Sequence, residues 1–223
     1  MRDLCILLDH SRATHIMAGF GLLALFLPSH DMPGMHDMPY TPNQFSLFNH
    51  HLAGVLIIFL AVFTFLEESA FRKAHSWVKY LWPMPLIAEA LNIILRGDSD
   101  LQWPIRLATI MPDAEAVQHK IFALLALGIA FIEFCRRTGR LSHPGRRDIF
   151  YGLMFGGGIF LFFHAGHHTM KIHYQHWAMG TWCVAVAVTR VGADLKPRTT
   201  WLPRYLLPLF IMGVGLQLFF YVE

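Results

Sequence analysis

Histidine is the residue type in this chain that is best suited to bind metals or transfer protons, and the chain contains 14 histidines. His164 is followed by His167 and His168, and this spacing places the three imidazoles on one face if the segment is helical. His173 and His176 come next, after a turn so short that the two flanking helices must be antiparallel neighbours. Imidazole is the commonest metal ligand in proteins near neutral pH. The spacing therefore predicts a metal or haem site at this hairpin.

Three more histidines are expected at the same depth as the hairpin. His50 and His51 open the second predicted helix, and His119 lies near the start of the fourth. A single histidine at a helix end is usually an interfacial polar residue, but a set drawn from four helices indicates a shared site. In each adjacent pair, we expect one member to face lipid headgroups or solvent. The candidate metal ligands are His50, His51, His119, His164, His167, His168 and His176.

Methionine accompanies histidine in two parts of the sequence. Met170 and Met179 each follow a histidine of the hairpin by three residues, and an earlier loop reads His30-Asp-Met-Pro-Gly-Met-His36-Asp-Met38. Thioether beside imidazole is a soft donor set that suits Cu(I). The loop is therefore expected to collect copper; the alternative is a polar loop with chance methionines. The secondary candidate ligands are His30, Met32, Met35, His36, Met38, Met170, His173 and Met179.

Polar residues also interrupt the apolar helices that must position these ligands. Glu89, Asn92 and Arg96 are spaced i, i+3, i+7 on one face of the third predicted helix. Polar groups inside a membrane are costly and usually functional. Glu89 is expected to pair with a buried histidine, to carry a proton or to orient a ligand, unless it makes only a structural hydrogen bond. Glu67, Glu68 and Glu133 fall at predicted helix ends, where we expect solvated positions at headgroup level.

The overall composition excludes several classes of protein. Of the 223 residues, 55% are hydrophobic and 15% charged, whereas a soluble domain has about 25% charged residues. This excludes an ordinary soluble enzyme, a disordered chain and a nucleic-acid binder. Three cysteines with no C-x-x-C pair exclude a disulfide scaffold and a zinc ribbon. No nucleophile elbow, P-loop or dinucleotide fingerprint is present.

Hydrophobic segments predict an all-α, polytopic membrane helix bundle, since a spanning helix needs about 20 apolar residues. About seven transmembrane helices are expected, over residues 13–28, 47–67, 78–96, 115–135, 149–170, 174–192 and 202–222. The first segment could instead be a signal peptide, but no A-x-A-like cleavage site follows it. We interpret it as a spanning helix.

The Lys and Arg residues predict the orientation of these helices. With the N-terminus in the cytoplasm, 14 of the 18 Lys and Arg residues lie on the inner side, as the positive-inside rule requires. Ten of the 14 histidines then lie on or near the outer face. Three parts of the chain are expected: a helix with a His/Met-rich outer loop in 1–46, a helical membrane domain in 47–192, and a C-terminal helix in 193–223.

The chain resembles the membrane domain of the copper-resistance protein D (CopD) family over roughly residues 47–192. The resemblance rests, in order, on His50-His51-x-x-Gly54, Trp82-Pro83, Gly97-Asp98 with Trp103-Pro104, Gln118-His119-Lys120, Glu133 before Arg136-Arg137, Gly157-Gly158, His164 with His167/His168, and His176. It implies a bacterial inner-membrane protein of copper uptake or tolerance, with His50, His51, His119, His164, His168 and His176 facing the metal. The family supplies no detailed mechanism.

Three functions remain open from the sequence. The first is a copper-handling membrane protein that binds copper on its outer side for uptake, tolerance or delivery to a periplasmic copper protein. The second is a b-type cytochrome with one outer haem held by two histidines. The third is an accessory subunit of a larger membrane metalloenzyme complex. Metal binding without catalysis is expected in the first case and oxidoreductase chemistry in the second; membrane lipid is the surrounding medium in all three.

Overall fold

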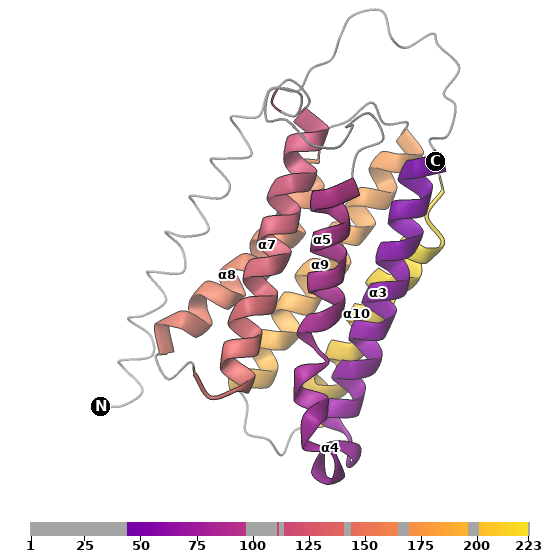
Figure 1. Cartoon of the computed structure of the whole chain (residues 1–223). Coiled ribbons are helices and arrows are strands. Elements are labelled where there is room, and N and C mark those ends of the chain that lie inside the picture. Colours follow the sequence, from indigo (N-terminus) through magenta and orange to yellow (C-terminus); the bar gives the residue numbers. More distant parts are fainter. Residues whose placement is uncertain are drawn as a thin grey trace, which may run out of the picture.

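The computed structural model describes residues 44–96, 111, 114–140, 144–164, 170–195 and 201–222. These residues are all-helical, and the part of the chain that the structure describes contains no strand. The long helices run side by side as a bundle (Figure 1). The predicted first helix, 13–28, and the loop that follows it lie outside the described residues.

Six long helices build the bundle, and two short helices connect the first pair. The elements are α3 (Gln44–Glu68), α4 (Phe71–Ala74), the 3-10 helix η1 (Ser76–Tyr80), α5 (Pro83–Arg96), α7 (Ala114–Arg137), α8 (Pro144–Phe162), α9 (Met170–Leu195) and α10 (Trp201–Phe219).

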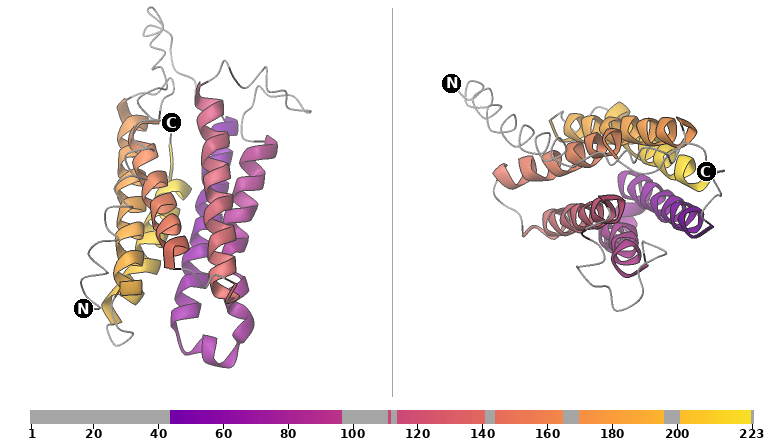
Figure 2. Two further views of the ribbon diagram at one scale, coloured as in Figure 1. Left: turned by 90° about the vertical axis from the view of Figure 1, so that its left-hand side faces the viewer. Right: turned by 90° about the horizontal axis from the view of Figure 1, so that it is seen from above.

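The six long helices form a closed ring. Each packs on the next in chain order, from α3 to α5, α7, α8, α9 and α10, and α10 packs back on α3. Seen from above, α3, α5 and α7 form one row of the ring, and α8, α9 and α10 form the other (Figure 2). The axis of this ring is the place where side chains of all six helices can meet.

Glycine brings the helices close together at two seams of the ring. At the α3–α10 seam, a Cβ on Gly54 would clash with the backbone nitrogen of Phe219, and one on Gly215 would lie 2.9 Å from the backbone nitrogen of Ile58. At the α8–α9 seam, a Cβ on Gly158 would lie 2.9 Å from the backbone nitrogen of Val184. Small residues permit this close backbone approach in membrane bundles.

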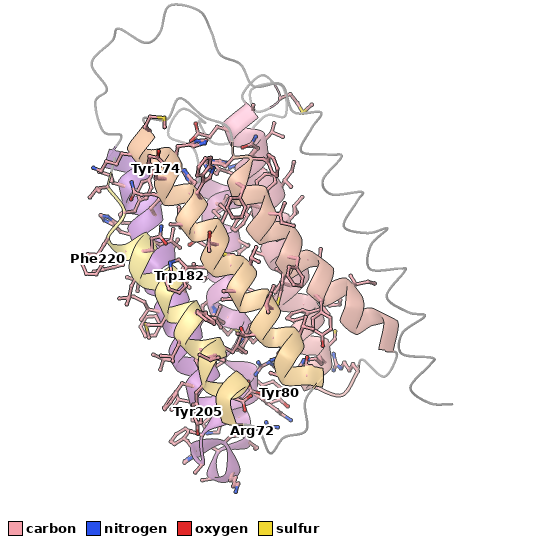
Figure 3. All side chains as sticks on the ribbon, turned by 180° about the vertical axis from the view of Figure 1, so that it is seen from behind. Arg72, Tyr80, Tyr174, Trp182, Tyr205 and Phe220 are labelled. Atoms are coloured by element: carbon pink, nitrogen blue, oxygen red, sulfur yellow. The ribbon has the colours of Figure 1, made fainter. Side chains whose placement is uncertain are left out.

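The outer surface of the ring is apolar, as a membrane protein requires. Three helical stretches are long and apolar enough to cross a membrane, namely Ser46–Glu68, Ser76–Leu95 and Ala114–Arg137, and the apolar parts of α8 and α10 are shorter. Exposed tyrosines lie towards both ends of the bundle, with Tyr174 at one end and Tyr80 and Tyr205 at the other, whereas Phe220 and Trp182 lie nearer its middle (Figure 3). Tyrosine is enriched at membrane–water interfaces.

The fifth predicted helix ends earlier than expected. The sequence predicts one helix over 149–170, but α8 ends at Phe162, where the amide of Phe163 donates to the carbonyl of Phe160 in a tight final turn. His164 therefore lies beyond α8. The expectation that His164 is part of this helix is therefore wrong, whereas His167 and His168 lie outside the described residues.

One end of the bundle, called here the arginine end, holds a buried ion network. Glu133 has no exposed surface, and it accepts hydrogen bonds from Arg136 Nε and Arg137 Nε, both at 2.6 Å. Arg137 also pairs with Glu67, which is only 8% exposed. Arg190 Nη2 lies 3.6 Å from Glu133 Oε1. The expected solvated positions of Glu67 and Glu133 are thus wrong, because arginines of α7 and α9 neutralise both carboxylates inside the bundle.

Candidate metal site

A cavity of about 470 Å³ lies on the axis of the ring, and residues of all six long helices line it. It extends from Ser46 and Glu115, at the end opposite the arginines, down to Trp82. We call that opposite end the imidazole end. None of the described residues that line the cavity is Lys or Arg, whereas two carboxyl groups and four imidazoles do line it. This lining favours a cation over an anion.

Four histidines form a row across the imidazole end of the cavity. The ring centroids of His119 and His164 are 5.2 Å apart, those of His164 and His176 are 4.7 Å apart, and those of His176 and His50 are 6.2 Å apart. His164 and His176 are 8% and 4% exposed, so these two imidazoles are buried polar groups. The imidazole row joins α3, α7, the segment after α8, and α9.

Glu115 adds a carboxylate to one end of the imidazole row. The ligand atoms of Glu115, His119 and His164 all lie within 4.8 Å of one another. Glu115 and His119 are four residues apart on α7, which places them on one helix face. Glu115 is not among the ligands predicted from the sequence, although the Glu115-x-x-x-His119 spacing is a pattern that indicates it.

His50 sits at the other end of the row and is held from two sides. Its Nδ1–H donates to the carbonyl of Ser46 at 2.8 Å, so Nε2 is the nitrogen that carries the lone pair. Its ring stacks on Tyr221, with centroids 3.9 Å apart and planes 13° apart. His51 instead donates from Nε2 to the carbonyl of Tyr221 at 2.9 Å. Of this adjacent pair, His50 lines the cavity and His51 contacts the segment after α10.

Glu89 and Asn92 occupy different surroundings on α5. Glu89 is 7% exposed and lines the cavity, and its buried Oε2 has no hydrogen-bond partner among the described residues. Asn92 Nδ2 donates to Asn49 Oδ1 at 3.4 Å, which ties α5 to α3. Buried carboxyl oxygens normally have a partner, so Glu89 Oε2 is a polar atom of the cavity wall whose partner the described residues do not supply.

The remaining predicted ligands divide into three groups. Met179 is 3% exposed and lines the cavity. Met170 is 66% exposed, and the ring of His173 lies against Trp177 with centroids 4.8 Å apart, so neither residue lines the cavity. Outside the described residues lie His30, Met32, Met35, His36, Met38, His167 and His168.

At the arginine end, Trp82 forms the floor of the cavity. Its Nε1 donates to Thr64 Oγ1 at 2.9 Å, and the guanidinium carbon of Arg137 lies 5.0 Å from the centroid of its ring. The cavity floor is therefore fixed by the same arginine that belongs to the buried ion network.

Comparison of the chain with protein-family models, with curated proteins and with solved structures finds no match. Membership in the copper-resistance family thus stays a prediction that rests on the sequence motifs named above.

Proposed function

We propose that this chain is a membrane protein that binds a transition-metal ion, copper foremost, at Glu115, His119 and His164. The observation that carries the proposal is the convergence of these three side chains, whose ligand atoms lie within 4.8 Å of one another. They come from α7 and from the segment after α8, which are neighbours in the ring. Two imidazoles and one carboxylate are a donor set found in many metal sites.

The donor set supports a divalent ion. Nitrogen and oxygen ligands suit Cu(II), Zn(II) and Fe(II), and copper binds most tightly in the divalent series. The soft thioethers that favoured Cu(I) are only partly represented, because Met179 lines the cavity and Met170 does not. We therefore assign Cu(II) to the cavity and leave Cu(I) capture to the loop of residues 30–38.

The place of the site in the membrane follows from the topology that we propose. With seven spans and a cytoplasmic N-terminus, the imidazole end faces the periplasm across a bacterial inner membrane. The cavity stops at Trp82 and the arginine network, where a cation meets the guanidinium of Arg137. This favours binding on the outer side and delivery to a periplasmic copper protein over passage through the bundle.

Metal analysis of the detergent-purified protein tests the proposal. The wild type should retain copper through gel filtration, and the double variant His119→Ala/His164→Ala should lose the ion bound at Glu115, His119 and His164, so that its copper content falls while its circular dichroism is unchanged. His173→Ala is the matched control, because His173 is at the same end but does not line the cavity. Equal copper in the double variant and the control would refute the site.

The size of the cavity favours haem b as a second candidate. Its volume of about 470 Å³ falls in the range of small-molecule pockets, and beyond the imidazole row its walls are mostly apolar. The two histidines of the row that lie on α3 and α9 would then be the axial ligands. An absorption spectrum of the oxidised and dithionite-reduced protein separates the two candidates, since only haem gives a Soret band that sharpens on reduction. A stable co-purifying partner would indicate the accessory-subunit role.

A further inference from the structure

The second half of the imidazole row has a donor arrangement of its own. His50 and His176, on α3 and α9, have ring centroids 6.2 Å apart. A metal–imidazole bond is about 2 Å long, so this separation leaves room for one ion between the rings. His119 and Glu115 belong to the opposite end of the row, and His164 lies between the two ends.

The orientation of His50 is the one that metal-binding imidazoles adopt. A ligating histidine almost always donates its other ring N–H to a carbonyl or carboxylate, which fixes the ring and its tautomer. The Nδ1–H bond from His50 to the carbonyl of Ser46, at 2.8 Å, is such a bond. Stacking on Tyr221 fixes the plane of the ring as well.

A carboxyl group of α5, that of Glu89, lines the same cavity as these two rings. Asn92 of α5 bonds to Asn49 of α3, which sets the register between the two antiparallel helices next to His50. Glu89 precedes Asn92 by three residues and therefore lies about one helical turn, roughly 5 Å, nearer the arginine end. Ala90 packs in a cluster with alanines of α7, so the α3 side of α5 carries Asn92 and Glu89.

Glu89 also needs a partner that the described protein does not supply. The residue is more than nine-tenths buried and lines the cavity, and its Oε2 is buried without a hydrogen bond to any described residue. An ionised carboxylate buried alone is costly, and a purely structural glutamate would be expected to bond across a helix interface. A cation in the cavity would supply the missing partner.

We propose that His50, His176 and Glu89 form a second metal position, adjacent to the one at Glu115, His119 and His164. This inference rests on the proposed function and extends it, so that the cavity holds two divalent first-row cations. Each position has two imidazoles and one carboxylate, and His164 stands between them. With no Lys or Arg among the described lining residues, no cationic side chain competes with either ion.

Counting bound ions tests the second position. The full chain, stripped with a chelator in detergent, is titrated with Zn²⁺ in a calorimeter, and bound zinc is measured after gel filtration. The wild type should bind two ions per chain. Glu89→Gln and His50→Gln should each bind one, His119→Ala should also bind one, and His173→Ala should bind two.

Loading with Cu²⁺ gives an independent readout of adjacency. Two neighbouring Cu²⁺ ions interact magnetically, so the electron paramagnetic resonance spectrum of the fully loaded wild type should be broadened. Glu89→Gln should give the sharp spectrum of an isolated ion. A structural role for Glu89 would lower the melting temperature of the protein but would not produce this change.

The outcomes separate the two proposals. A wild type that binds no metal refutes both of them. A wild type that binds one ion, lost in His119→Ala and retained in Glu89→Gln and His50→Gln, overturns the second position and leaves the first. The second position is likewise overturned if Glu89→Gln and His50→Gln both bind two ions. It is also overturned if Glu89→Gln is folded but binds no metal, because all the donors would then form a single site.

Discussion

His50 lies flat against Tyr221, with ring centroids 3.9 Å apart and planes 13° apart. Tyr221 follows α10 and is 1% exposed, and its backbone carbonyl accepts a hydrogen bond from the neighbouring His51. Tyr221 thus contacts two consecutive histidines of α3 in different ways: its ring stacks on His50, and its main-chain carbonyl bonds to His51. The end of the last helix thereby determines which of the two imidazoles lines the cavity.

Removal of the Tyr221 ring should weaken metal binding without removing a ligand. We expect Tyr221→Ala to lower the affinity of the position at His50 by about 10–100-fold, the range seen when a group that orients a ligand is lost. Tyr221→Phe keeps the ring and should bind like the wild type. Competition titration with a chelator measures both. Equal affinities in the alanine and phenylalanine variants would show that the stack does not orient His50.

The α3–α10 seam should tolerate no side chain at Gly54. A Cβ there would clash with the backbone of Phe219, and backbone cannot move aside as a flexible side chain can. We expect Gly54→Ala to destabilise the protein by about 1–3 kcal/mol, the usual effect of overpacking.

Gly192 provides the control for the Gly54 substitution, because a Cβ at this α9 position has no neighbour within 4 Å. Gly192→Ala should be neutral or stabilise the helix by up to about 1 kcal/mol. Thermal melting in detergent compares the two variants, and equal melting temperatures would show that the seam can open.

Glu133 should be the most sensitive position at the arginine end. Glu133→Gln keeps the shape of the side chain but removes the charge that faces Arg136, Arg137 and Arg190. We expect a loss of about 3–5 kcal/mol, as for other buried ion pairs that lose one partner. Glu68→Gln, at the half-buried end of α3, should cost far less. Denaturation followed by circular dichroism measures both, and similar losses would contradict a central role for Glu133.

Deletion of residues 30–38 should slow metal loading and leave the final metal content unchanged. The His/Met-rich loop is expected to capture copper, whereas the proposed binding site is in the cavity. Stopped-flow mixing with copper measures the loading rate, and metal analysis at equilibrium measures the content. A deletion variant that never loads would place the binding site in the loop.

The sequence predicted the six long helices of the described residues, though not all of their bounds, and predicted that imidazoles gather at one end of the bundle. Long apolar runs determine spanning helices almost by themselves, because a membrane leaves few other structures possible. The sequence also identified His50, His119, His164 and His176 as candidates, and the structure brings these four to one cavity. Helical periodicity could not predict the end of α8 at Phe162, which depends on a single tight turn.

Partners across the bundle could not be predicted from the sequence. Glu67 and Glu133 looked like surface carboxylates because their neighbours in sequence suggested helix ends, but Arg137 and Arg190 meet them from other turns and another helix. Spacing also could not decide between His50 and His51. That choice depends on contacts with the segment after α10, where the ring of Tyr221 stacks on His50 and its carbonyl accepts a hydrogen bond from His51.

The contact between α3 and α10 also has a consequence for biosynthesis. Until α10 is made and docks on α3, the other five helices form an open arc, and the cavity has no wall on that side. Tyr221, which stacks on His50, follows α10 in the chain. A chain synthesised only as far as α9 therefore lacks both this wall of the cavity and the ring that packs on His50.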